Sequence, residues 1–79
     1  MSALPNLKAV FDEFNVRFFA GKLFTPRLIW NSKLKSTAGR FGRGTLVASP
    51  RIEIATFLLE GADSINVVRD TMGHEMIHY

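Results

Sequence analysis

The first stretch of the chain has its apolar residues at the spacing of one helix face. Between Asn6 and Ala20 they recur at intervals of three and four, and charged residues fall off this stripe. Asn6, which follows Pro5, is a suitable N-cap, and Gly21 suits the end of the helix. We predict a helix whose stripe faces the core, with an exposed interaction surface as the alternative. The stripe consists of Leu7, Val10, Phe11, Phe14 and Phe18.

Three short segments then carry the marks of β-strands. Pro26–Trp30 is a short apolar run entered through a proline, and Thr37–Thr45 holds three glycines around one phenylalanine. Arg51–Ala55 alternates charged and apolar residues, which is the period of a half-buried strand. Three consecutive short strands predict a small, three-stranded, mainly antiparallel sheet packed on the first helix.

The last segment predicts a second helix that begins near Asp63 and Ser64, both good capping residues. Gly73 lowers its helix propensity by about 1 kcal/mol relative to alanine, and a glycine here can admit a neighbouring backbone. No capping signal ends the helix at Tyr79, so we expect it to continue further. The pattern predicts one α+β domain over residues 1–79. The apolar face of this helix consists of Val68, Met72 and Met76, widened by Ile65 and Ile77.

The bulk composition is that of an ordinary globular domain, with 47% hydrophobic and 22% charged residues. A chain of 79 residues buries only roughly 60–65% of its unfolded surface, so its core is small. The absence of cysteine excludes disulfides and thiolate metal sites. The N-terminus lacks the pattern of a secretory signal, and no apolar run is long enough to span a bilayer. We therefore expect a soluble, cytoplasmic protein with no membrane association.

The net charge of +3 is unevenly distributed. No Asp or Glu occurs from Gly21 to Ile52, while seven of the ten basic residues lie there. Such a segment predicts either a solvated basic surface or a face that meets polyanions. Trp30 or Phe41 would offer a stacking surface for bases, although core packing is the simpler interpretation of both. The candidate nucleic-acid contacts are Lys33, Lys35, Arg40 and Arg43.

The chain ends with candidate metal chemistry: His74, Glu75 and His78 form the pattern H-E-x-x-H. Residues four apart on a helix lie on the same face, so both histidines can bind one zinc ion. Glu75 lies beside that ion and can act as the general base for a zinc-activated water, whose pKa falls to about 7. The simpler alternative is two surface histidines on an amphipathic helix.

A third zinc ligand is not evident, because the chain has no other histidine and no cysteine. Asp70 lies one turn before His74, but about 12 Å of helix separates residues 70 and 78, too far for one ion. A carboxylate from another segment, the carboxylate of Tyr79, or a dimer that shares one ion remain as alternatives. The carboxylates in question are Glu53, Glu60 and Asp63.

Several motifs together resemble the SprT-like metallopeptidase domain, the family that includes Spartan-type proteases of DNA–protein crosslinks. They are "FNVRFFAGKL" at the end of the first helix, "PRLIW" and "TAGRF" in the first two strands, "RIEIA", and "HEMIHY". The resemblance runs from about Phe11 to Tyr79 in the family's order. It implies a zincin-type active-site helix with His74 and His78 as zinc ligands and Glu75 as the catalytic base.

The resemblance also implies a zinc-dependent peptidase that cleaves protein substrates, with DNA association in some members. In that family the third zinc ligand is a histidine beyond the motif, so we expect this chain to be the front part of the domain, truncated just after H-E-x-x-H. Gly73 departs from the larger apolar residue that is frequent in the family. Two other functions stay open: a non-catalytic basic module that binds nucleic acid, and a small structural zinc protein that dimerises through its two histidines.

Overall fold

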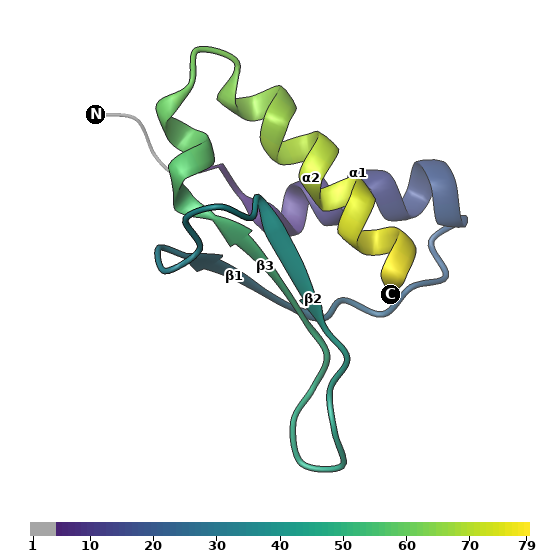
Figure 1. The fold of residues 1–79 in the computed structure, drawn as a ribbon. Helices are drawn as coiled ribbons and strands as arrows, with labels where there is room; N and C mark the ends of the chain where they lie inside the picture. Colours follow the sequence, from purple (N-terminus) through teal and green to yellow (C-terminus); the bar gives the residue numbers. More distant parts are fainter. Residues whose placement is uncertain (1–4) are drawn as a thin grey trace.

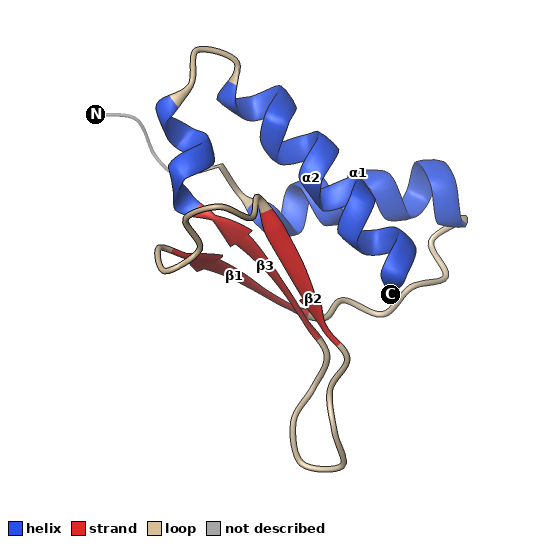
Figure 2. Cartoon of the chain, viewed as in Figure 1, coloured by secondary structure: helices blue, strands red, loops and turns tan. Residues whose placement is uncertain are grey.

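Two helices lie on one face of a three-stranded sheet in the computed structural model, which describes residues 5–79 (Figures 1 and 2). The order along the chain is α1 (Leu7–Phe19), β1 (Arg27–Asn31), β2 (Gly39–Gly42), β3 (Arg51–Ala55), a 3₁₀ helix η1 (Thr56–Glu60) and α2 (Ser64–His78). The predicted α+β class and the positions of both helices and all three strands are confirmed. Within residues 5–79, neither α1 nor α2 has the length and apolar character of a bilayer-crossing helix.

Helix α1 begins and packs as its sequence predicts over its first half. The side chain of Asn6 accepts a hydrogen bond from the backbone N–H of Ala9 at 3.2 Å, which satisfies one free donor of the first turn. Phe11 is fully buried, whereas Phe18, two turns later on the same stripe, is 64% exposed. The stripe is therefore core at its N-terminal end and surface at its C-terminal end.

The sheet is mixed, which corrects the prediction of a mainly antiparallel one. Strand β3 lies in the centre, antiparallel to β2 and parallel to β1. The segment 32–38 leads from β1 at one edge of the sheet to β2 at the other edge. The β2–β3 hairpin then places β3 between β1 and β2. Local alternation predicts which face of a strand is buried, but it does not specify this crossover.

The core lies between the sheet and the two helices. Ile52 and Ile54 on β3 are fully buried and meet the row of Val68, Met72 and Met76 on α2, as the spacing predicts. The expected widening of this face is wrong, because Ile65 and Ile77 are 48% and 74% exposed. A charged residue, Glu75, is buried on this helix instead.

A carboxylate network covers the sheet face that no helix covers. Glu53, on the central strand, accepts hydrogen bonds from Asn31 on β1 and from Arg51, the latter at 2.6 Å, and pairs with Arg40 on β2 at 3.2 Å. Burial raises the pKa of Glu53, but the bonds from Arg51, Asn31 and Arg40 outweigh it and lower this pKa from 4.5 to about 2. The side chain of Glu53 is only 5% exposed, so the arginine side chains shield it from water.

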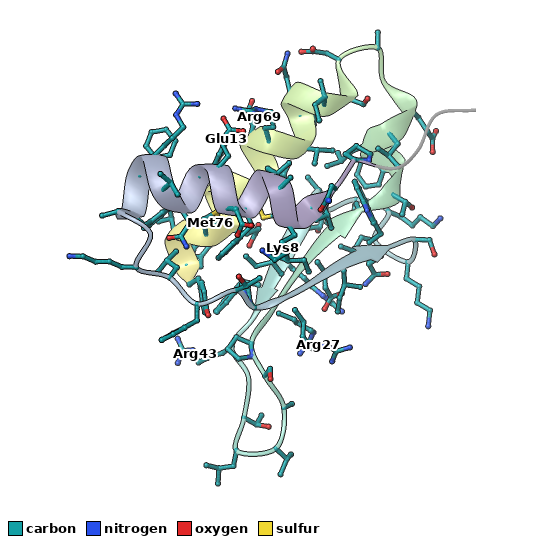
Figure 3. All side chains as sticks on the ribbon, turned by 180° about the vertical axis from the view of Figure 1, so that it is seen from behind. Lys8, Glu13, Arg27, Arg43, Arg69 and Met76 are labelled. Carbon is teal, nitrogen blue, oxygen red and sulfur yellow. The ribbon has the colours of Figure 1, made fainter. Side chains whose placement is uncertain are left out.

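A second ion pair joins the two helices. The two terminal guanidinium nitrogens of Arg69 on α2 donate to the carboxylate of Glu13 on α1, at 2.5 and 2.7 Å (Figure 3). The bond from Arg69 is the largest influence on the pKa of Glu13; burial opposes it, a bond from Arg17 adds to it, and the net result is a pKa of about 2. Arg69 also lies over the ring of Phe14, 5.3 Å from its centroid.

Acid should destabilise the fold through these two carboxylates. Each binds its proton more weakly in the folded chain than in the unfolded one, so their stabilisation is present above about pH 4.5 and is lost as the pH falls toward 2. For Glu53 alone we expect the free energy of unfolding to drop by about 1–2 kcal/mol between pH 5 and pH 3, measured by urea titration. Glu53→Gln should flatten this dependence and Glu60→Gln, at an exposed glutamate, should not. An unchanged pH dependence in Glu53→Gln would contradict the account.

Candidate metal centre

The two histidines of the motif lie side by side on α2. His74 and His78 are both exposed, and their ring centroids are 5.3 Å apart with the ring planes at 78°. Zinc–nitrogen bonds of about 2.0–2.1 Å require the two ligating nitrogens to lie within about 4 Å of each other. Rings at this separation can meet that requirement by rotating about their own side-chain bonds. The pair therefore fits a zinc ion as two of its ligands.

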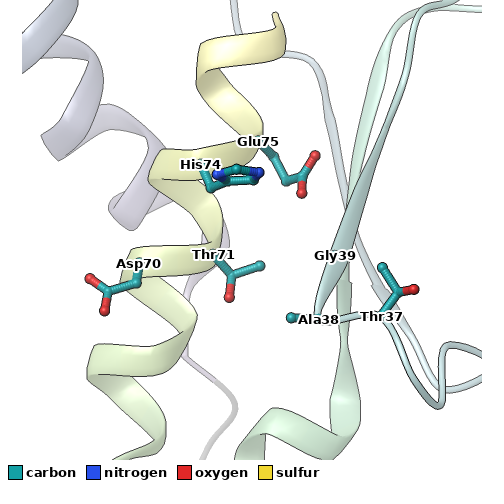
Figure 4. Close-up of a pocket in the computed structure, with 7 residues that line it drawn as sticks. All are labelled: Thr37, Ala38, Gly39, Asp70, Thr71, His74 and Glu75. Carbon is teal, nitrogen blue, oxygen red and sulfur yellow. The ribbon is translucent and has the colours of Figure 1, made fainter.

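Glu75 is positioned differently from the histidines that flank it in the motif. Its side chain is 7% exposed and extends from α2 toward β2 (Figure 4). There it borders a hollow of about 350 Å³ between the helix and the strand. None of the ion pairs within residues 5–79 involves Glu75, so no neighbouring cation holds its carboxylate. The other residues that line the hollow are Thr37, Ala38, Gly39, Asp70, Thr71 and His74.

A glycine on β2 sets the distance between the strand and helix α2. A Cβ atom at Gly39 would lie 2.8 Å from Cγ2 of Thr71 and 2.9 Å from the backbone oxygen of Glu53. Both separations are shorter than atoms tolerate, and the backbone oxygen belongs to the central strand and cannot move aside. Only glycine therefore allows α2 to pack this closely against β2, which brings Glu75 to the strand.

A second glycine fixes the opposite side of α2. A Cβ atom at Gly73 would lie 2.7 Å from Cε2 of Phe14, so the ring of Phe14 occupies the space that a side chain would take. A neighbouring group does approach Gly73 closely, as predicted. That group is an aromatic ring of α1 and not a backbone segment. Helix α2 is held between β2 on one side and α1 on the other.

The ring of Tyr79 has a packing role that the sequence analysis did not predict, since only its carboxylate was considered there, as a zinc ligand. Tyr79 follows His78 directly, and its half-buried ring packs 5.8 Å from Phe41 on β2 and 6.4 Å from Phe11 on α1, centroid to centroid. This packing holds the last turn of α2, and with it His78, against the body of the domain. The sequence feature that could have indicated this packing is an aromatic residue directly after the second histidine.

No third ligand completes the site within residues 5–79, where no three His, Cys, Asp or Glu side chains come close enough to share a metal ion. Asp70 points away from His74 and Glu75 (Figure 4). Glu53 is engaged with its arginines on the uncovered face of the sheet. The structure thus brings together the predicted ligands His74 and His78 with the predicted base Glu75, and it adds no further ligand to them.

The predicted nucleic-acid contacts do not form a single cluster. Lys33 and Lys35 are exposed on the segment between β1 and β2, and Arg43 is exposed beyond the other end of β2. The guanidinium of Arg40 is paired with Glu53, the first acidic residue after the basic stretch. Trp30 and Phe41 pack against the core, which agrees with the simpler interpretation of both aromatic residues.

Comparison with known proteins gives one match. The family model described as "SprT-like family" matches residues 7–79, which is nearly the whole chain. No curated protein and no solved structure gives a significant match.

The close packing at Gly39 leads to a stability test. Gly39→Ala should lower the free energy of unfolding by about 1–3 kcal/mol, because the new methyl group meets a backbone oxygen of the central strand. Gly61→Ala is the matched control, since a Cβ atom at Gly61 has no neighbour within 4 Å. Denaturant titration of both variants measures the difference. Equal stability of the two variants would contradict the packing described at Gly39.

Zinc binding should be weak and should depend on both histidines. We expect a dissociation constant weaker than roughly 1 µM by calorimetry, because two imidazoles fall short of the three or four protein ligands of typical sites. His74→Ala should abolish the binding, and Asp70→Asn should leave it unchanged. One-to-one binding in the nanomolar range would mean that a third ligand acts, and loss of affinity in Asp70→Asn would identify it.

Proposed function

The chain belongs to the SprT-like family, and from this premise we propose that it carries the central part of a zinc metallopeptidase site. In this proposal His74 and His78 bind zinc and Glu75 is the general base. The observation that supports it best is the division of the motif helix, where the two histidines are exposed together while Glu75 is buried beside a hollow. Two unrelated surface histidines would not require a buried, unpaired carboxylate between them.

Each residue has a distinct chemical task in the proposed reaction. When bound, zinc supplies the Lewis acidity that activates water for attack on a peptide carbonyl. The imidazoles of His74 and His78, on adjacent turns of α2, would hold the ion. The carboxylate of Glu75 accepts the proton of the attacking water and then delivers it to the departing amine.

The strand beside the hollow offers a way to hold an extended peptide. Strand β2 is an edge strand, and Ala38 and Gly39 at its start line the hollow together with Glu75. An extended chain can add to such an edge through backbone hydrogen bonds, which are independent of its side chains. This supports peptide bonds of protein substrates as the target of the site.

A complete catalytic site needs at least one more protein ligand than residues 5–79 supply. The proposal therefore assigns to this chain two ligands, the base and a hollow for the substrate. A third ligand has to come from outside the described residues or from a second molecule.

A second proposed function is association with nucleic acid through basic residues that have no acidic partner. Within residues 5–79, Arg27, Lys33, Lys35 and Arg43 are exposed and take part in no ion pair. Unpaired cations of this kind release counterions from a phosphate backbone and so favour binding without sequence preference. Arg40 contributes less to this surface than its sequence position suggests, because Glu53 offsets its charge.

The role of Glu75 can be separated from zinc binding. Glu75→Gln should retain zinc affinity but lower the rate of peptide-bond cleavage by about 10²- to 10⁴-fold, because the amide cannot accept the proton. The comparison is made in a zinc-loaded protein in which the third ligand is present, and cleavage of an unfolded protein is followed through newly formed amino termini, with Glu60→Gln as the control. Undiminished cleavage by Glu75→Gln would contradict its role as the base, and no cleavage once all three ligands hold zinc would reduce the site to metal binding.

A further inference from the structure

The loop between β2 and β3, residues 43–50, extends well away from the rest of the domain (Figure 1). Its end carries two adjacent aliphatic side chains, Leu46 and Val47, whose relative exposures are 105% and 96%. They are the most exposed large apolar residues of the described chain. These two neighbouring aliphatic side chains are held fully in water at the end of a projecting loop, where a partner can reach them.

The end of this loop has a defined conformation. The backbone N–H of Thr45 bonds the carbonyl oxygen of Ala48 at 2.7 Å, and the hydroxyl oxygen of Thr45 accepts from the N–H groups of Val47 and Ala48 at 3.2 and 3.1 Å. Gly44, with φ of +84°, packs so closely on Pro50 that a Cβ atom would lie 2.7 Å from the proline nitrogen. These contacts form a closed turn that presents Leu46 and Val47 outward.

The base of the loop is cationic. Arg27 and Arg43 lie on either side of it (Figure 3). The backbone N–H of Arg27 donates to the backbone carbonyl oxygen of Pro50 at 3.0 Å. Neither arginine takes part in an ion pair within residues 5–79. Acidic residues are absent from Gly21 to Ile52, so nothing along the loop offsets these charges. The loop thus combines an apolar end with a positively charged base.

We propose that this loop is a wedge for double-stranded nucleic acid, in which Leu46 and Val47 enter a groove and unstack a base step while Arg27 and Arg43 contact the phosphates at its rim. Apolar side chains inserted between base steps are a known means of deforming a duplex. The proposal rests on the nucleic-acid association described above and names the loop that would enter the duplex.

The dimensions of the loop match a groove. Leu46 lies three positions after Arg43, so a chain that rises about 3.3 Å per residue places the aliphatic end at most about 10 Å beyond the arginines. The minor and major grooves of a duplex are about 7.5 and 8.5 Å deep. Side chains at this reach meet the base pairs when the guanidinium groups are level with the phosphates.

The charge at the base of the loop favours phosphates as the partner of the wedge, because the guanidinium fork of arginine matches phosphate oxygens. Lys33 and Lys35 lie on the segment that joins β1 to β2, at the end of the sheet opposite the projecting loop (Figure 1), so they take no part in the wedge.

The test uses the full chain and a short DNA duplex with 2-aminopurine at a TA step, a step that unstacks easily. Binding at low salt should increase the fluorescence of the probe, because an unstacked base is less quenched. The double variant Leu46→Ser, Val47→Ser should lose this increase while its binding keeps the same salt dependence. Val16→Ser is the matched control, since Val16 is 70% exposed on α1, and it should behave as the wild type. Arg27→Gln and Arg43→Gln should each reduce the salt slope by about 1.

The outcomes separate the wedge from the association on which it rests. Salt-dependent binding without a fluorescence increase overturns the wedge and leaves the nucleic-acid association in place. No binding to the duplex at low salt overturns both and leaves the peptidase proposal untouched. Binding to vesicles of anionic lipid that is lost in the double variant, with no change in the DNA probe, assigns the loop to membranes and overturns the proposal.

Discussion

The close approach of α2 to β2 at Gly39 is the constraint on which the candidate site depends. A hydrogen atom in place of a side chain lets Thr71 and the backbone of β3 come within contact distance of the strand. The ring of Phe14 beside Gly73 closes the other side of the helix. With both sides fixed, the rotation of α2 about its axis is set, and that rotation places Glu75 toward the strand with the exposed His74 beside it at the hollow. The chemistry proposed for the motif thus follows from two positions at which no side chain fits.

Charge is arranged in the fold differently from its arrangement along the chain. The basic stretch has no acidic residue of its own, but the first acid after it, Glu53, lies in the central strand and binds two of its arginines. A buried carboxylate with several donors is stable only as a complete network, because an unpaired arginine or glutamate there would be costly. What remains positive is the periphery: the segment between β1 and β2 and the base of the projecting loop. That distribution explains why the nucleic-acid contacts inferred from the structure include Arg27 and give less weight to Arg40.

Much of the fold follows from local patterns, while the site depends on contacts between distant residues. The cap at Asn6 and the buried row of α2 are properties of short segments, and the structure confirms them. The alternation in β3 predicts a half-buried strand, and this is wrong, because Glu53 is buried among its arginines as Ile52 and Ile54 are buried in the core. The parallel pairing of β1 with β3 is not local, because it depends on where the loops carry the chain. Phe18 and Ile77 follow apolar spacing but are exposed, since periodicity identifies a face and not the element that covers it. The histidine pair could be predicted from its spacing of four, whereas the burial of Glu75 requires knowledge of Gly39.

Nuclear magnetic resonance of the two imidazoles can show whether they share one zinc ion, because the chain contains only these two histidines. We expect zinc to shift the ring signals of His74 and His78 together, with one saturation curve. Because zinc competes with protons for the ring nitrogens, a lower pH should be needed to protonate the two rings with zinc present than without it. Perturbation of one ring alone, or independent curves for the two, would show that the pair does not share an ion and would contradict the proposed metal centre.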